Sequence, residues 1–162
     1  MTDPIAAARA NWVAAGWADA AEGMAAVTSV MRAQQILQAR VDEVLREFQL
    51  SFARYELLML LHFSRRGSLP LKKASERLQV HPTSVTNGVD RLAAAELVVR
   101  RPQPTDGRAT LVEITDEGRR VALKATDALN AAVFTRPGLA GGQLTALVDV
   151  LDALRRGAGD LD

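Results

Sequence analysis

The sequence predicts a mainly helical protein that carries one small antiparallel β-hairpin. Apolar residues recur at helical spacing over most of the 162 residues. Two short β-prone runs flank a segment rich in Pro, Asp and Gly between residues 102 and 107, which is a hairpin signal. Hydrophobic residues make up 48% of the chain and aromatic residues only 4%, so the core is expected to consist mainly of Ala, Leu and Val, a bias that favours helices.

The N-terminal part is expected to be helical. Residues 1–23 are Ala-rich and contain both Trp residues, Trp12 and Trp17, which either pin a short arm onto the body or line a pocket. From Met24 to Phe48 apolar residues recur without Gly or Pro, which predicts one amphipathic helix of about 36 Å. Such a helix is longer than a small core can cover, so part of its apolar face is expected to contact a partner chain.

A second helix is expected to follow, with Ser51 as its N-cap. The apolar residues between Tyr55 and Leu61 give it a heavily buried pattern. His62 lies on or near that apolar surface. It is either a packed core or edge histidine or a residue that senses a ligand.

A basic segment containing Gly67 and Pro70 separates this helix from the next one, because both residues interrupt helices. Residues 71–78 are expected to form a short helix. Its apolar residues would face inward, and Lys72 and Lys73 would face solvent.

A further helix is expected to begin at Pro82, because a first helical residue needs no N–H group and benefits from a fixed φ. His81 or Thr83 would supply the cap. Apolar residues recur at positions 85, 89 and 92. The other faces carry a polar set: Thr83, Ser84, Thr86, Asn87 and Arg91.

Gly88 breaks a local rule, since Gly inside a helix costs about 1 kcal/mol relative to Ala. Either the helix backbone approaches DNA or another helix closely at this point, or the glycine is simply tolerated. Arg91 has two interpretations as well. It either contacts a phosphate or braces the helix by pairing with Asp90 or another acid.

The two β-prone runs cover residues 97–101 and 109–114, with a long turn between them. A helix of this size followed by a two-stranded hairpin is the layout of a winged helix-turn-helix. In that layout the helix fills the DNA major groove, and the hairpin, or wing, reaches a neighbouring minor groove or the phosphates.

The C-terminal part predicts two more helices. Thr115 caps the first, which carries acidic residues in its first turn and runs to about Phe134. The second lies near residues 142–156 and carries an apolar stripe. The last residues, 157–162, are expected to fray.

The charge is distributed unevenly along the chain. Residues 65–108 hold nine Lys or Arg and four acidic residues, a net charge of +5, whereas the remainder sums to −4. A basic segment in an otherwise acidic chain is either a nucleic-acid contact surface or an ordinary solvated face. Because the basic residues coincide with the winged-helix pattern, the DNA interpretation is favoured.

This pattern resembles the MarR family of transcriptional regulators. The resemblance extends loosely over residues 24–156, although Asn87-Gly88 and Glu96 depart from the usual residues. It rests on Val85-Thr86, Val89-Asp90-Arg91-Leu92, Leu97-Val98, Arg100, the wing Pro102-x-Pro104-x-Asp106-x-Arg108, and the closing Leu111-Val112-x-Ile114-Thr115-x-x-Gly118.

The resemblance implies a bacterial homodimer that represses transcription from a roughly palindromic operator. A cytoplasmic location is the default expectation, because the sequence predicts neither a membrane span nor a signal peptide. A small ligand, commonly an aromatic or phenolic acid in relatives, would release it by binding between the dimerisation helices and the winged helix. It also implies a very short strand at residues 68–69. The expected division is an N-terminal arm and long dimerisation helix (1–48), a winged helix-turn-helix (49–115) and C-terminal dimerisation helices (116–162).

Individual residues of the wing and the helices can be given expected roles. Arg108 is expected to enter the minor groove, since a narrow groove attracts Arg, and Asp106 is expected to brace the wing by pairing with an Arg. Trp17 and His62 are the ligand candidates. The predicted DNA-binding set is Lys72, Lys73, Thr83, Ser84, Thr86, Asn87, Arg91, Arg101 and Arg108, with the lysines on phosphates.

Other classes of protein find less support. The chain has no Cys and only two His, and it shows no Ser/His/Asp spacing, phosphate-binding glycine loop or metal motif, so neither an enzyme nor a cofactor is expected. No apolar run approaches the roughly 20 residues of a membrane span, and no signal peptide is evident. The alternative is a winged-helix protein-interaction module without specific DNA readout.

Overall fold

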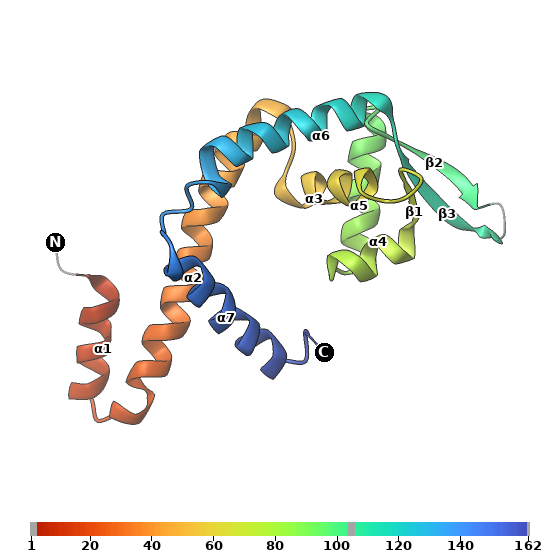
Figure 1. Ribbon diagram of the computed structural model, residues 1–162. Coiled ribbons are helices and arrows are strands. Elements are labelled where there is room, and N and C mark those ends of the chain that lie inside the picture. Colours follow the sequence, from red (N-terminus) through yellow and green to blue (C-terminus); the bar gives the residue numbers. More distant parts are fainter. Residues whose placement is uncertain (1–2, 104–105, 162) are drawn as a thin grey trace.

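The computed structural model describes residues 3–103 and 106–161; the side chains of residues 103 and 106–109 lie outside the described part. The chain is mostly helical, with a small three-stranded antiparallel sheet, which confirms the predicted fold class. Figure 1 shows a lobe that holds the sheet and helices α3 to α5, and long helices that extend away from it.

The N-terminal helices form a hairpin at the end of the molecule remote from the sheet (Figure 1). Helix α1 spans Pro4–Ala14 and helix α2 spans Ala18–Leu45, followed by a 3₁₀ turn, η1, at Arg46–Phe48. Helix α2 therefore begins six residues before the predicted Met24, because Gly23 does not interrupt it. The rings of Trp12 and Trp17 meet edge to face at 5.4 Å, which fits the packing interpretation.

The next three helices form the body of the lobe: α3 at Phe52–His62, α4 at Leu71–Leu78 and α5 at Pro82–Ala94. The predicted N-cap of α3 is confirmed, since the Ser51 hydroxyl accepts a hydrogen bond from the Arg54 amide at 3.4 Å. Helix α4 has the predicted bounds and buries Ala74 and Ser75.

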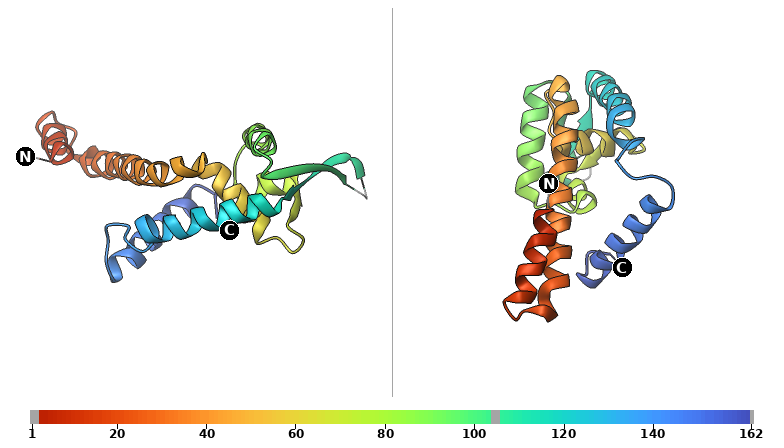
Figure 2. Two further views of the ribbon diagram at one scale, coloured as in Figure 1. Left: turned by 90° about the horizontal axis from the view of Figure 1, so that it is seen from above. Right: turned by 90° about the vertical axis from the view of Figure 1, so that its left-hand side faces the viewer.

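Three strands complete the lobe: β1 at Ser68–Pro70, β2 at Val98–Gln103 and β3 at Asp106–Ile114. Strand β3 lies between the other two and is antiparallel to both, and the predicted short strand at residues 68–69 is confirmed. Strand β2 continues past the predicted residue 101, because Pro102 still pairs with Thr110 before the register shifts. The hairpin projects from the lobe in the view from above (Figure 2, left).

The core joins the lobe to the C-terminal half of α2 and to helix α6, which spans Asp116–Leu129 and continues as a π-helical turn, η2, at Asn130–Phe134. Val41 and Leu45 of α2 and Leu129 of α6 are buried with the apolar residues of α3, α5 and the sheet. The predicted cap of α6 is confirmed: the Thr115 hydroxyl accepts a hydrogen bond from the Gly118 amide at 2.9 Å.

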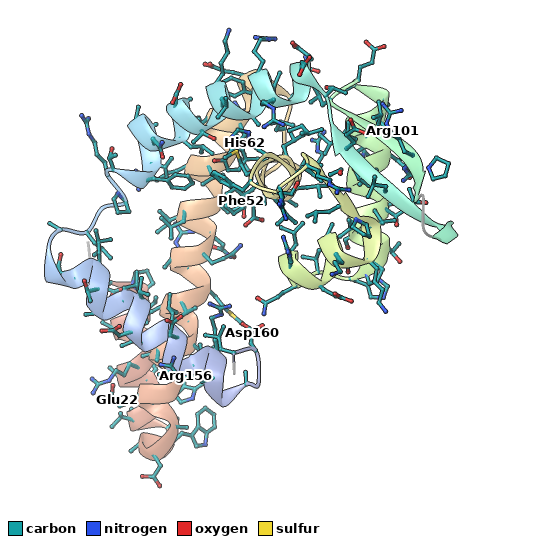
Figure 3. All side chains as sticks on the ribbon, turned by 45° about the vertical axis from the view of Figure 1, so that its right-hand side comes forward. Glu22, Phe52, His62, Arg101, Arg156 and Asp160 are labelled. Carbon is teal, nitrogen blue, oxygen red and sulfur yellow. The ribbon has the colours of Figure 1, made fainter. Side chains whose placement is uncertain are left out.

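The last helix, α7 at Gly142–Gly157, has no buried residue although it carries the predicted apolar stripe. The N-terminal half of α2 likewise exposes Val27, Val30 and Met31. After α7 the chain reaches the turn between α4 and α5, where Gln79 donates a hydrogen bond to the Asp160 carbonyl at 3.0 Å (Figure 3). None of the helices in the described part has the length and apolar composition of a membrane span.

Candidate nucleic-acid interface

Helix α5 presents a polar face to solvent. Its buried side consists of Val85, Val89 and Leu92, as the helical spacing predicts. Four of the five polar residues expected on its other faces are exposed: Thr83, Ser84, Asn87 and Arg91. The fifth, Thr86, is half-buried and donates its hydroxyl proton to the Pro82 carbonyl at 3.0 Å, so it offers an outside partner only its acceptor lone pair.

The turn before α5 is held by two local hydrogen bonds. The His81 ring accepts a hydrogen bond at Nδ1 from the Thr83 amide at 3.2 Å, which selects His81 over Thr83 as the cap. The buried Ser75 hydroxyl donates to the Val80 carbonyl at 2.7 Å. Together these bonds fix how α5 leaves α4, and therefore where its first turn points.

Gly88 is half-buried and its Cα faces helix α3. A Cβ atom built on Gly88 would lie 3.9 Å from side-chain carbons of Arg54 and Leu57 in α3, which is ordinary van der Waals contact. The close approach that one interpretation required is therefore not found at α3. Gly88 also leaves the polar face of α5 unaltered.

The two lysines of α4 are exposed, as predicted. Lys72 and Lys73 lie in the first turn of the helix, on the side away from the buried Ala74. Ammonium groups on such a surface are suited to phosphate contacts, which position a protein on DNA without specifying sequence.

Arg100 ties the wing to helix α5. Its guanidinium lies 2.6 Å from the Asp90 carboxylate and 3.4 Å from the Thr86 carbonyl oxygen. The alternative in which Asp90 braces Arg91 is therefore wrong, because Asp90 pairs with a residue of β2. The side chain of Arg91 stays exposed on α5.

We expect the Asp90–Arg100 pair to contribute little to global stability. The two side chains are 57% and 38% exposed, and exposed ion pairs are typically worth about 0.2–1 kcal/mol. A double-mutant cycle of Asp90→Ala and Arg100→Ala, measured by urea unfolding, should give a coupling free energy below about 1 kcal/mol. A coupling of several kcal/mol would show that the tether is needed for the fold itself.

Arg101 lies on the wing beside Glu113 of β3, with 2.6 Å between Arg101 Nε and the carboxylate (Figure 3). In the described part of the chain this bond occupies only Nε, which leaves the terminal N–H groups for a phosphate. Asp106 and Arg108 belong to β3, but their side chains lie outside the described residues, so wing bracing and minor-groove insertion stay predictions.

The two ligand candidates lie far apart. Trp17, 56% exposed, lies in the turn between α1 and α2, whereas His62 ends α3 at the other end of α2 (Figures 1 and 3). The Nδ1 atom of His62 lies 2.7 Å from the Arg119 guanidinium, and its ring meets Phe63 edge to face at 5.1 Å. These contacts fit the packed interpretation of His62.

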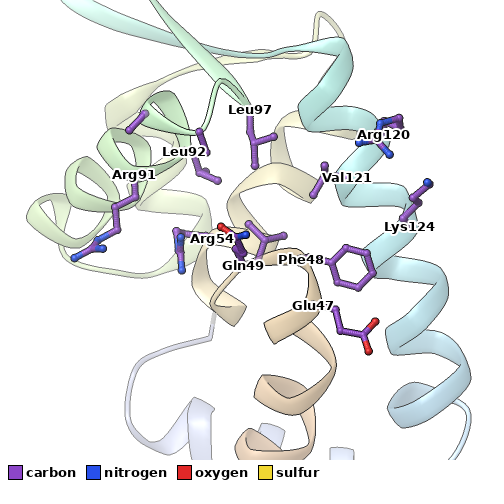
Figure 4. Close-up of a pocket in the computed structure, with 13 residues that line it drawn as sticks. Glu47, Phe48, Gln49, Arg54, Arg91, Leu92, Leu97, Arg120, Val121 and Lys124 are labelled. Atoms are coloured by element: carbon purple, nitrogen blue, oxygen red, sulfur yellow. The ribbon is translucent and has the colours of Figure 1, made fainter.

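A cleft that sequence reasoning missed opens where η1, the start of α3, the end of α5 and the start of α6 meet (Figure 4). Its volume is about 700 Å³. It is lined by Glu47, Phe48, Gln49, Leu50, Arg54, Arg91, Leu92, Ala94, Ala95, Leu97, Arg120, Val121 and Lys124. These residues come from distant parts of the sequence, so no local spacing could have linked them.

Two carboxyl groups near these elements have shifted pKa values. The Arg120 guanidinium hydrogen-bonds Glu117 and lowers the pKa of that carboxyl, an effect that solvent at this exposed site screens. Burial raises the pKa of Glu56 on α3. Over the described residues no cluster of three or more His, Asp or Glu side chains is arranged to hold a metal ion.

The chain is similar in sequence and in structure to known proteins. The model of the MarR family matches residues 48–109. The structure of Sco5413, a MarR family transcriptional regulator from Streptomyces coelicolor, is 50% identical, with a TM-score of 0.79 over 87% of this chain and 98% of that one. Sco3205, a MarR family regulator from the same organism solved in complex with DNA, is 27% identical, with a TM-score of 0.74 over 85% and 88%.

The curated relatives match over a shorter segment. The HTH-type transcriptional regulator YhbI of Bacillus subtilis (strain 168) is 34% identical over 85 residues, which is 52% of this chain and 54% of YhbI. The chain thus spans about half the length of the curated relatives it matches.

Proposed function

We propose a function from one premise: the chain belongs to the MarR family of transcriptional regulators. Its similar proteins are transcriptional regulators and not enzymes, and Sco3205 was solved bound to DNA. The finer proposal is a homodimeric repressor that binds a palindromic operator and is released by a small ligand.

One observation carries the DNA-binding proposal. The exposed side of α5 offers Thr83, Ser84, Asn87 and Arg91, on a helix whose start is fixed by two hydrogen bonds. Short polar and amide side chains at the start of a helix suit base edges in the major groove, which is wide enough to admit one helix.

The proposed contacts divide into two kinds. Lys72, Lys73 and Arg101 would contact phosphates, whereas the polar residues of α5 would meet base edges and Arg108 would enter the minor groove. Two such lobes in a symmetric dimer would occupy half-sites about 34 Å apart. Residues 49–115 would supply this lobe, and residues 1–48 and 116–162 the dimerisation helices.

Release by a ligand requires that the ligand bind one arrangement of the two lobes more tightly than the other. A ligand that binds both arrangements with equal affinity does not change their populations. The protein-interaction alternative rests on Asn87-Gly88 and on the modest net charge of +1. With Gly88 directed at α3, only Asn87 remains on the outer face, where an amide suits DNA as well as protein.

The proposal is tested by binding of the purified protein to DNA from upstream of its own gene and to scrambled DNA, at two salt concentrations. We expect tighter binding to the first and a steep loss of affinity with salt, at a slope of about −0.9 per phosphate contact. Arg108→Ala should weaken specific binding by about tenfold or more, since one good groove contact is worth about 1–3 kcal/mol.

Arg136→Ala removes the same charge from the exposed loop between η2 and α7, away from the lobe, and serves as the control. Weak and equal binding to both DNAs, with no difference between Arg108→Ala and Arg136→Ala, would contradict operator recognition at this site. Salt-insensitive binding of a protein partner would then favour the alternative module.

A further inference from the structure

Arg40, in the C-terminal half of helix α2, holds the loop that leaves η2. Its half-buried guanidinium donates to three backbone carbonyl oxygens: to Arg136 at 2.6 Å, to Pro137 at 3.1 Å and to Ala132 at 3.2 Å. These acceptors lie 92 to 97 residues further along the chain. One side chain therefore joins the long N-terminal helix to the place where α6 and η2 end.

Pro137 leaves the carbonyl group of Ala132 without its regular backbone partner. In a π-helical turn the amide of residue i+5 donates to the carbonyl of residue i, as Thr135 does to Asn130 at 3.1 Å. The corresponding donor for Ala132 would be Pro137, which has no N–H group. Arg40 supplies a donor in its place, and its positive charge suits the negative end of a helix.

An arginine fits this position better than a lysine. A guanidinium carries five N–H groups in one plane and can serve several acceptors at once, whereas an ammonium is a compact point charge. Glu43 and Glu47 of α2 line the same surface hollow as Arg40, but in the described part of the chain neither forms an ion pair with it. The guanidinium is thus directed at the loop and not at its acidic neighbours.

Helix α7 does not obtain its direction from packing of its own, because none of its residues is buried. The loop before it contains Gly138 and Gly141, both with positive φ, and glycine permits many directions of the backbone. In the right-hand view of Figure 2, α7 stands apart from α2 and is joined to α6 by this loop. The contacts at the two ends of α7 therefore determine its direction.

The far end of α7 contacts the turn between α4 and α5. Arg155 pairs with the Asp160 carboxylate at 2.6 Å and donates to the Gln79 side-chain oxygen at 3.3 Å. The side chains of Arg155 and Asp160 are 43% and 40% exposed, and exposed ion pairs contribute little. The three bonds of Arg40 are therefore the stronger of the two attachments.

We propose that Arg40 is the positioning residue of α7: by holding the end of η2 it sets the direction in which α7 leaves the body of the chain. The consequence for assembly rests on the function proposed above. Two copies of α7 that meet in a homodimer at a fixed angle would fix the separation of the two lobes, and with it the half-site spacing that the dimer accepts.

The direction of α7 is measurable without DNA. The chain has no Cys, so Lys124→Cys on α6 and Ala153→Cys on α7, both at exposed positions, provide two unique sites for nitroxide labels. Labelled chains diluted with an excess of unlabelled chains report distances within one chain by double electron–electron resonance. We expect one narrow distance distribution for this labelled chain and a broad one after Arg40→Ala. Arg40→Lys, which keeps the charge without the planar fork, should give an intermediate width.

Arg46→Ala is the matched control. It removes the same charge just after α2, at an exposed side chain that forms no hydrogen bond or ion pair within the described residues, and should leave the distribution narrow. Sedimentation equilibrium should show a dimer dissociation constant raised about tenfold or more by Arg40→Ala, since a loosened α7 must be ordered on association. Arg40→Lys should raise it less, and Arg46→Ala should not raise it.

An equally narrow distribution for Arg40→Ala and Arg46→Ala would overturn the proposal, and so would equal broadening by both. Far-ultraviolet circular dichroism checks that each variant is folded, and recovery with Arg40→Lys separates positioning from a general loss of structure. The proposed function fails in a different way. An unsubstituted chain that stays monomeric, or that shows no operator preference, would contradict the dimeric repressor, whereas the label distances would still report on Arg40.

Discussion

Replacing Gly118 by Ala is expected to destabilise the fold by about 3 kcal/mol or more. The new Cβ atom would lie closer than 3.0 Å to both the carbonyl oxygen and the carbonyl carbon of Leu97, which are backbone atoms and cannot rotate away. Overpacking a close contact costs about 1–3 kcal/mol, and a lost hydrogen bond adds about 1 kcal/mol.

The Leu97 carbonyl is unable to move freely because it accepts a hydrogen bond from the Thr115 amide at 3.1 Å. Gly118 is itself held by the Thr115 hydroxyl. Any shift that accommodates a methyl group therefore disturbs the start of α6 and its join to the strand that follows α5. The stability loss should appear as a lower urea midpoint in far-ultraviolet circular dichroism.

Gly88→Ala is the matched control, since it adds the same methyl group to a glycine inside helix α5. Its Cβ would have its nearest neighbours at 3.9 Å, and Ala is favoured over Gly inside a helix by about 1 kcal/mol. Gly88→Ala should therefore raise the urea midpoint while Gly118→Ala lowers it. If both variants unfold at the wild-type midpoint, the contact with Leu97 does not constrain the fold.

Local chemistry made the helices of this chain predictable. The caps at Ser51 and Thr115, the first residue of α5 at Pro82 and the bounds of α4 all follow from residues within one turn of the feature they determine. The buried apolar stripe of α5 is likewise predictable from the helical spacing of its own residues alone. Each of these predictions is confirmed because no distant contact opposes it.

The features that sequence missed depend on contacts between distant elements. Gly118 belongs to a motif that the sequence shows. The reason that only a glycine fits there is the carbonyl group of Leu97, which lies 21 residues earlier in the chain. Asp90 forms its ion pair with Arg100 on β2 and not with the neighbouring Arg91 on α5. The cleft of Figure 4 is lined by cationic side chains from α3, α5 and α6, and no spacing along the chain brings these together.

The pair of substitutions Leu147→Glu and Leu154→Glu on α7 is expected to abolish the proposed dimer and weaken operator binding by about a hundredfold. These residues are 40% and 60% exposed in the single chain, and no residue of α7 is buried. A fully buried Leu contributes about 1.5–3 kcal/mol, and symmetry would apply both changes twice. A single lobe then has to bind its half-site without its partner.

The fold of the monomer should survive, because the buried core of the described chain ends at Val133, before α7 begins. Sedimentation velocity at micromolar concentration should show a dimer for the wild type and a monomer for the variant, with unchanged circular dichroism. Thr145→Glu adds an acid to the opposite side of α7 and should leave the dimer intact. Retention of the dimer in the double variant would exclude the stripe of α7 from the interface, and the exposed half of α2 around Val30 would then have to provide it.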